Sequence, residues 1–433
     1  MYNFAIDLQN RIHIFCREGV WLCFDRDSNR IFKLTEEEAV ALQHVSEHPE
    51  YEITPKQNLI LAELEKLIGE SVLEYRELEP VNTFYLRLNR QCNLQCDYCR
   101  AISKAEKLLD KRLLNPELAS RAANVMMKLG AKGVGLHGGE PIMDWDNTAD
   151  VLCAIRKESP SLVVGLTCNG TLITEEIARF LKTMNVRVSV ELDGSQKIYD
   201  KFKCYVNGRS SYEDALTGAK LLRDQGILVA IESTVSGIEG YDNEGYQNMA
   251  SMFPEIPIVV ARIKSRETMQ WVCHGKALEN FLRQQLENIG RNKSVVNDAV
   301  AGLVNLCSSP SLSAYRCICL LDKVSVDLDG SVYLCPKKED SHTLIGNVTD
   351  EDFVKTFHER RLQAAQRFAI KPIESVWYSG LTEYCVDSTY ENDAGQDKLQ
   401  DEDVLSRFYE DLIYFSVKND TSFLWDRWVN SGF

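Results

Sequence analysis

Three cysteines, Cys92, Cys96 and Cys99, lie close together in the first quarter of the chain. Their C-x3-C-x2-C spacing places three soft thiolates on one loop, directly after the predicted strand Thr83–Leu88. Three thiolates suit a cubane cluster of four irons, because one iron then has no protein ligand and can bind a substrate. A structural zinc site needs four ligands, and no histidine or fourth cysteine lies close in sequence. The spacing therefore favours an iron–sulfur cluster with one open iron.

Three later strand ends carry residues suited to binding a charged ligand. The first, His137-Gly-Gly-Glu-Pro141, follows the predicted strand Gly133–His137. Its two glycines allow a ligand to approach the backbone closely, and its glutamate can pair with an ammonium group. Taken alone, a Gly-Gly pair after a strand is more often only a turn. The other two strand ends are Thr167-Cys-Asn-Gly-Thr171 and Ser189-Val-Glu-Leu-Asp-Gly194.

The cysteine loop, with Tyr98 just before its last cysteine, resembles the signature of the radical S-adenosylmethionine (SAM) superfamily. The three strand-end motifs resemble further motifs of the superfamily and follow in the same order. The resemblance implies that the cluster binds SAM and cleaves it reductively to methionine and a 5′-deoxyadenosyl radical, which abstracts hydrogen from the substrate. It also implies a set of cofactor-binding residues, namely Tyr98, Gly138, Gly139, Glu140, Pro141, Thr167, Asn169, Glu191, Asp193 and Lys203.

Within this set, residues 138–141 resemble the motif that holds the amino group of SAM, and Asn169 is the candidate for its ribose and carboxylate. Residues 189–194 resemble the S-x-D-G strand end of the peptide-modifying branch. Glu191 stands where serine is usual there, and Lys203 stands where an arginine usually follows. These two positions therefore depart from the family pattern. A lysine cannot form the two parallel hydrogen bonds that a guanidinium group donates.

A second group of cysteines lies in the region from Cys307 to Cys335. The arrangement Cys319-x10-Gly330-x4-Cys335 resembles the opening of the auxiliary-cluster domains called SPASM and twitch domains, and Cys317 fits the same window. The dense cysteine run of a full SPASM domain is missing, and only Cys385 follows. We therefore expect one auxiliary 4Fe-4S cluster, with the ligands Cys317, Cys319, Cys335 and Cys385, the alternative being that some of these are buried free thiols. Such a cluster can accept an electron from a product radical, which implies net oxidation of the substrate.

Alternating apolar segments place the motifs in an α/β domain. The predicted strands are Thr83–Leu88, Gly133–His137, Leu162–Thr167, Val186–Leu192, Ile227–Thr234 and Ile256–Ile263, with helical segments between them. This alternation predicts parallel strands, and six strands are too few for a closed barrel of eight. We expect a partial (β/α)6 barrel of the radical SAM type, with its chemistry at the carboxyl ends of the strands. The predicted domains are a winged-helix-like module (1–80), the barrel (81–275), a helical bridge (276–306), a small iron–sulfur domain (307–390) and a helical tail (391–433).

The N-terminal module is expected to contain three short strands, at Arg11–Phe15, Gly19–Phe24 and Arg30–Lys33, followed by a helix capped by Thr35. Residues 20–39 resemble the precursor-recognition element of enzymes that mature ribosomally made peptides. Such an element binds a leader peptide by adding it as a strand to an exposed sheet edge. A structural cap or a dimerisation domain is the alternative interpretation.

Together the resemblances imply a peptide maturase that installs an intramolecular carbon–carbon or ether crosslink, with the incomplete SPASM region resembling that of darobactin synthases. Sactipeptide-type thioether synthases and peptide epimerases would share every motif. A sulfatase-maturing oxidase is disfavoured by the lack of a second auxiliary cluster and by the extra module. From another class, the chain could be an iron–sulfur peptide-binding or electron-transfer module. The expected partners are a precursor peptide and a reductant such as flavodoxin or ferredoxin.

Composition excludes several other classes. The 49 Lys and Arg against 64 Asp and Glu give a net charge of −15, which disfavours binding to nucleic acid. No apolar run approaches the roughly 20 residues of a membrane span, and the start of the chain does not resemble a signal peptide. The 14 cysteines of so long a chain therefore indicate reduced, metal-binding thiols in a cytoplasmic protein.

Overall fold

The computed structural model describes most of the predicted barrel and parts of the regions on either side. The described residues are 11–25, 30–47, 54–69, 78, 80–99, 109–235, 242–262, 276, 279–284, 295–297, 323–336, 338–366 and 402–418. Three predicted ligands of the auxiliary cluster, Cys317, Cys319 and Cys385, lie outside the described residues, as does most of the predicted helical bridge.

A ten-stranded sheet forms the body of the molecule and contains all six predicted strands. They are β4 (Thr83–Arg87), β6 (Gly133–His137), β7 (Val163–Cys168), β8 (Val186–Glu191), β10 (Leu228–Val235) and β11 (Ile258–Arg262). These strands are parallel and lie in the order β4-β6-β7-β8-β10-β11, with the short β12 (Val295–Asn297) beyond β11. The predicted partial barrel is confirmed.

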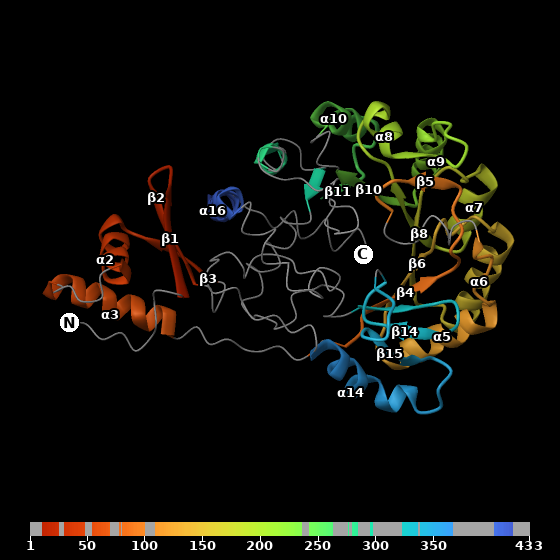
Figure 1. Cartoon of the computed structure of the whole chain (residues 1–433), viewed down its shortest axis with the longest axis horizontal. Helices are drawn as coiled ribbons and strands as arrows, with labels where there is room; N and C mark the ends of the chain where they lie inside the picture. The colour runs from red at the N-terminus through yellow and green to blue at the C-terminus, as the bar shows by residue number, and fades with distance from the viewer. Residues whose placement is uncertain are drawn as a thin grey trace.

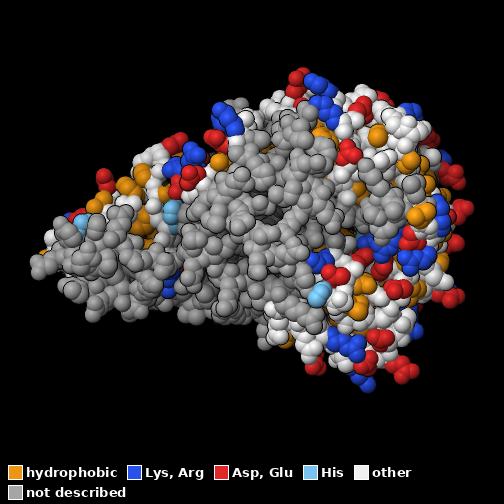
Figure 2. Space-filling model, viewed as in Figure 1, with side chains coloured by type: hydrophobic (Ala, Val, Ile, Leu, Met, Phe, Trp, Pro, Cys, Tyr) orange, Lys and Arg blue, Asp and Glu red, His pale blue; other side chains and the backbone are white. Residues whose placement is uncertain are grey.

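Helices between the strands cover the outer side of this sheet (Figure 1). They are α5 (Pro116–Lys128), α6 (Trp145–Glu158), α7 (Glu175–Thr183), α8 (Gln196–Phe202), α9 (Tyr212–Asp224) and α10 (Asn243–Met252). Their apolar faces join the strands in one continuous core, while charged side chains of both signs are mixed over the described outer surface (Figure 2). No helix within the described ranges has the length and apolar character that crossing a membrane requires.

A hairpin of the C-terminal region joins the barrel sheet. β13 (Lys323–Val326) and β14 (Ser331–Tyr333) are antiparallel, and the turn between them uses Gly330 at a φ of 85°, which favours glycine. β13 also pairs in parallel with β4, β15 (Leu344–Asn347) pairs with β14, and α14 (Phe353–Gln366) follows. The described part of the predicted iron–sulfur domain thus extends the barrel sheet instead of forming a sheet of its own.

The N-terminal module is an antiparallel sheet of three strands, β1 (Ile12–Arg17), β2 (Val20–Asp25) and β3 (Arg30–Leu34), followed by α2 (Glu36–Glu47) and α3 (Pro55–Gly69). Thr35 caps α2 as predicted, because its Oγ1 accepts a hydrogen bond from the N–H of Glu38 at 3.2 Å. The module lies at one end of the molecule, and α16 (Glu402–Lys418) lies between it and the barrel in Figure 1. Ion pairs join α16 to β1, among them Arg17 Nε to Asp411 Oδ1 at 2.6 Å.

Candidate active site

The cysteine loop follows β4 and is held by a small two-stranded sheet. In this sheet β5 (Leu94–Cys96) pairs with β9 (Lys203–Tyr205), which sets Cys96 opposite Lys203. The three cysteines of the loop are partly exposed and form no disulfide. Among the described residues no three His, Cys, Asp or Glu side chains are arranged to hold a metal ion, so the structure brings the three thiols onto one loop without closing them around a common centre.

Glu140 is a buried carboxylate at the end of β6. Its oxygens accept hydrogen bonds from the backbone N–H groups of Asn169, at 2.8 Å, and Ile142, at 3.3 Å. Within the described part of the chain no cationic side chain pairs with it. Burial raises the pKa of Glu140 to about 8, although the two N–H groups oppose this shift. The next residue, Pro141, uses its carbonyl to accept a hydrogen bond from Thr148 Oγ1 at 2.6 Å.

The turn that carries Glu140 is tied to the cysteine loop. The N–H of Glu140 donates to the carbonyl of Gln91 at 2.6 Å, and the N–H of Gly139 donates to that of Asn89 at 3.1 Å. A Cβ atom on Gly138 would lie only 2.8 Å from the carbonyl oxygen of Asn89. Glycine is therefore required for the two segments to approach this closely.

Asn169 and its neighbours fasten the end of β7 to the same loop. The side-chain N–H of Asn169 donates to Asn93 Oδ1 at 2.8 Å, and its Oδ1 accepts from the N–H and hydroxyl of Thr171 at 2.9 and 2.7 Å. Asn93 in turn donates to Thr171 Oγ1 at 2.8 Å. The predicted SAM-binding asparagine is thus part of a network that orients the cysteine loop. Sequence reasoning missed Asn93, although it adjoins Cys92.

Asp193 and Lys203 form a buried ion pair, here called the lock, between the end of β8 and the cysteine loop. Lys203 Nζ lies 3.2 Å from Asp193 Oδ2 and 3.7 Å from Glu191 Oε2, and the Tyr98 hydroxyl donates a hydrogen bond to Asp193. Burial disfavours the charged form of Lys203, but these carboxylates outweigh it and hold its pKa above the usual value. Asp193 Oδ1 also accepts from the N–H of Thr234 on β10 at 2.7 Å. Three of the predicted cofactor-binding residues, Tyr98, Asp193 and Lys203, thus bind each other.

A carboxylate on β10 was missed by sequence reasoning. Glu232 Oε1 accepts from the hydroxyl of Ser189 at 2.6 Å, and Thr167 Oγ1 lies 3.0 Å from Ser189 and 3.4 Å from Glu232. These residues line neighbouring strand ends and form a polar row across β7, β8 and β10. The available signal was a single acidic residue interrupting the apolar run Ile227–Thr234.

Comparison with known proteins identifies the central domain. The model of the radical SAM superfamily matches residues 86–253. This range is therefore similar to a radical SAM domain, and it is called the radical SAM domain below. It holds the cysteine loop and all three strand-end motifs, which the fold brings to the same edge of the sheet.

Three similar proteins each match more than 60% of this chain. GTP 3′,8-cyclase of Aquifex aeolicus is 22% identical over 298 residues, which cover 64% of this chain and 88% of the cyclase. The cysteine-type anaerobic sulfatase-maturating enzyme of Clostridium novyi is 24% identical over 292 residues, covering 62% and 76% of the two chains. The structure of Streptococcus suis SuiB bound to S-adenosylmethionine matches with a TM-score of 0.57 at 14% identity, over 90% of this chain and 97% of SuiB. The fold likeness to SuiB thus extends beyond the radical SAM domain.

Proposed function

We propose that the chain is a radical SAM peptide maturase, which abstracts hydrogen from a ribosomally made precursor peptide and installs an intramolecular crosslink. The observation that carries the SAM part is Glu140, a buried carboxylate tied to the cysteine loop and without a cationic partner among the described residues. The residues present fit the cofactors, because three thiols that form no disulfide offer soft ligands to iron and Glu140 offers an acceptor to the amino group of SAM.

A 4Fe-4S cluster and SAM bound here would supply a 5′-deoxyadenosyl radical that removes a hydrogen atom from the substrate. The protein holds and orients these groups. Cys92, Cys96 and Cys99 would ligate three irons, and the lock of Lys203 with Asp193 keeps their loop against β8. For the ribose and carboxylate of SAM, the proposed contacts remain Thr167, Asn169 and Glu191, with Gly138, Gly139 and Pro141 shaping the turn around Glu140.

The N-terminal module supports a peptide substrate. Its three-stranded sheet with a following helical pair is the part of the chain to which the fold likeness with SuiB extends, and SuiB has been solved bound to its precursor peptide SuiA. We propose that residues 1–80 bind the leader segment of a precursor as an added strand. The barrel at 81–275 would then act on the core segment of the same peptide.

The bond formed is proposed to be a carbon–carbon or ether crosslink of the darobactin-synthase kind. One auxiliary 4Fe-4S cluster, ligated by Cys317, Cys319, Cys335 and Cys385, would accept the electron released when the substrate is oxidised. Of these four residues, Cys335 lies among the described ones and is buried at the end of the β13–β14 hairpin. A flavodoxin or ferredoxin would reduce the SAM-binding cluster. A thioether synthase or an epimerase would use the same architecture, and product mass separates the latter, because a crosslink removes two hydrogens whereas epimerisation leaves the mass unchanged.

A nucleotide-cyclising activity is the second candidate. It is supported by the sequence similarity to GTP 3′,8-cyclase over 64% of this chain. A small nucleotide substrate would leave the N-terminal sheet without a ligand-binding role. Incubation with GTP or with a candidate precursor peptide separates the two candidates by which substrate is consumed.

The test of the proposal is SAM cleavage by anaerobically reconstituted protein with dithionite, measured as release of 5′-deoxyadenosine. We expect release from the parent protein and a loss of two hydrogens from the precursor. Replacing Cys92, Cys96 and Cys99 together by alanine should abolish release and leave leader binding intact. The matched control is Cys153→Ala, which removes an exposed cysteine of α6. Continued SAM cleavage by the triple variant would show that the loop does not hold the cluster, and a parent that binds the precursor without cleaving SAM would be a binding module.

A further inference from the structure

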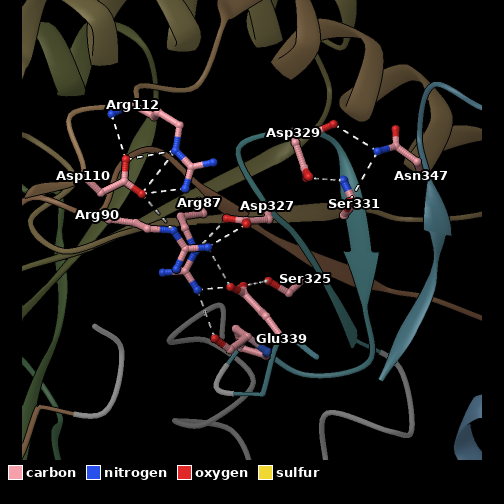
Figure 3. A network of polar contacts seen from close by, with 11 residues as sticks. Arg87, Arg90, Asp110, Arg112, Ser325, Asp327, Asp329, Ser331, Glu339 and Asn347 are labelled. Carbon is pink, nitrogen blue, oxygen red and sulfur yellow. Dashed lines mark hydrogen bonds and ion pairs between the residues drawn. The ribbon is translucent and has the colours of Figure 1, made fainter. Parts of the chain in front are cut away.

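Polar side chains at the strand ends of the barrel form two separate groups. At the end of β4, two arginines pair with acidic residues of the C-terminal hairpin region (Figure 3). Arg87 Nη2 donates to Glu339 Oε1 at 2.7 Å. Arg90 Nη2 donates to Asp327 Oδ2 at 2.6 Å. The second group is the polar row across β7, β8 and β10, in which hydroxyl groups bind the carboxylate of Glu232.

The polar row lies on the inner face of the sheet, beside Glu140. Side chains alternate between the two faces of a strand, and the residues that precede the three members of the row are fully buried in the core beneath the outer helices. The members of the row therefore point inward. Thr167 stands two residues before Asn169, whose N–H donates to Glu140 at 2.8 Å. Within the row Ser189 is fully buried and Thr167 is partly exposed, so Thr167 can contact a ligand.

The directions of the hydrogen bonds in the row follow from its carboxylate. An ionised carboxylate only accepts hydrogen bonds, whereas a hydroxyl group has one hydrogen to donate. Ser189 donates its hydrogen to Glu232 Oε1 at 2.6 Å, so it can only accept at its 3.0 Å contact with Thr167. Thr167 then donates within the row, either to Ser189 or to Glu232 Oε1 at 3.4 Å. Its oxygen keeps a free lone pair for a ligand but has no hydrogen left to donate.

We propose that Glu232 is a positioning residue that makes Thr167 Oγ1 an acceptor for a ribose hydroxyl group of SAM. This inference rests on the proposed function, in which both the ribose and the carboxylate of SAM are candidate partners of Thr167. The SAM carboxylate has no hydrogen to donate, so it cannot bind an oxygen that only accepts. Of the two candidates, only the ribose has hydroxyl hydrogens that match the direction set by Glu232.

The test is a double-mutant cycle on SAM affinity, measured by calorimetry with anaerobically reconstituted full-length protein. Thr167→Val removes the acceptor, and Glu232→Met removes the group that orients it. Each change should weaken SAM binding at least about threefold, because a hydrogen bond to the ligand is lost or misdirected. The double variant should bind no more weakly than Thr167→Val alone, since the two residues act through one contact.

Two further variants separate the acceptor from the charge. Glu232→Gln keeps an oxygen that can accept from Ser189, so its SAM affinity should equal that of the parent protein. A loss as large as that of Glu232→Met would overturn the inference. The matched control is Glu176→Met, which removes an exposed carboxylate from α7 and should leave SAM affinity unchanged.

Analogues of SAM give a readout that a merely structural role would not move. The 2′-deoxy and 3′-deoxy analogues each lack one ribose hydroxyl group. With the analogue that lacks the partner of Thr167, the parent, Thr167→Val and Glu232→Met proteins should bind equally. Losses of the same size with SAM and with both analogues would overturn the inference. Losses that disappear only with decarboxylated SAM would also overturn it, because they would assign Thr167 to the SAM carboxylate.

The outcomes separate this inference from the proposed function. A reconstituted parent protein that binds no SAM would contradict the proposed function itself. A parent that binds SAM, with independent effects of Thr167→Val and Glu232→Met, would contradict only the role of Glu232. If Glu232→Met does not fold, Thr167→Val decides with the two deoxy analogues, and a loss of affinity that persists with both would overturn the inference.

Discussion

At the scale of single residues, the ionised form of Glu140 that would bind SAM lowers the stability of the folded protein. A carboxyl group with a raised pKa binds its proton more tightly in the folded chain than in the unfolded chain. The stabilisation that this provides is complete below a pH of about 4.5 and is lost as the pH rises through about 8. A ligand that donates a hydrogen bond to the ionised Glu140 offsets the cost of burying its charge. The site is therefore suited to binding a ligand with such a donor.

Glu140→Gln should therefore make the cofactor-free protein more stable at high pH. We expect equal melting temperatures at pH 5 and a higher melting temperature for the variant at pH 8.5, since each pKa unit corresponds to about 1.4 kcal/mol. The variant should also bind SAM at least about tenfold more weakly once the cluster is reconstituted, because a hydrogen bond to a charged group is lost. Thermal melts at the two pH values and SAM titration measure both effects. Glu255→Gln, at an exposed position, is the control, and identical pH dependence in the two variants would contradict the assignment.

At the scale of elements, the ion pair of Lys203 with Asp193 ties β9 to the segment that follows β8. Lys203→Met would leave the buried Asp193 carboxylate without its cation, which typically costs about 3–5 kcal/mol. We expect a lower denaturation midpoint and faster loss of iron from the reconstituted cluster, because β9 pairs with the strand that carries Cys96. Lys182→Met, at an exposed position of α7, should change neither. Unaltered iron retention in Lys203→Met would mean that β5 is held without the lock.

Sequence patterns were sufficient for the six parallel strands of the barrel and insufficient for the contacts between distant elements. The strands of the barrel were predictable because each is an apolar run. The turns were predictable because glycines follow the strands. Pairs such as Arg87 with Glu339 are 252 residues apart, and no local pattern indicates which acidic residue a buried arginine will meet. The parallel pairing of β13 with β4 joins Lys323 to Thr83, 240 residues apart, so no local pattern indicated that this hairpin extends the barrel sheet.

At the scale of the whole molecule, the N-terminal module contacts α16 near the other end of the sequence. Besides Arg17 with Asp411, His13 Nε2 lies 2.8 Å from Glu410 Oε1, and Lys418 Nζ lies 2.7 Å from Glu18 Oε2. Besides these partly or fully exposed pairs, apolar residues of both segments belong to one hydrophobic cluster, including Phe15, Leu22, Phe24, Phe408, Leu412 and Ile413. Because ion pairs in contact with solvent contribute little, the buried apolar surface must supply most of the attachment.

A chain that ends at residue 401 should therefore lose the fixed position of its N-terminal module. Without α16, the apolar side chains of β1 and β2 that belong to this cluster become exposed, so hydrogen exchange of these strands should accelerate at least about tenfold. If the module binds the leader, precursor turnover should fall while SAM cleavage without precursor continues. Leu412→Asp in the full chain tests the same contact by placing a charge in the apolar cluster, and Arg179→Glu on α7 is the exposed control. Unchanged exchange of β1 and β2 in both the truncated and the Leu412→Asp proteins would show that α16 does not hold the module, because each change removes or disrupts the contact of α16 with β1.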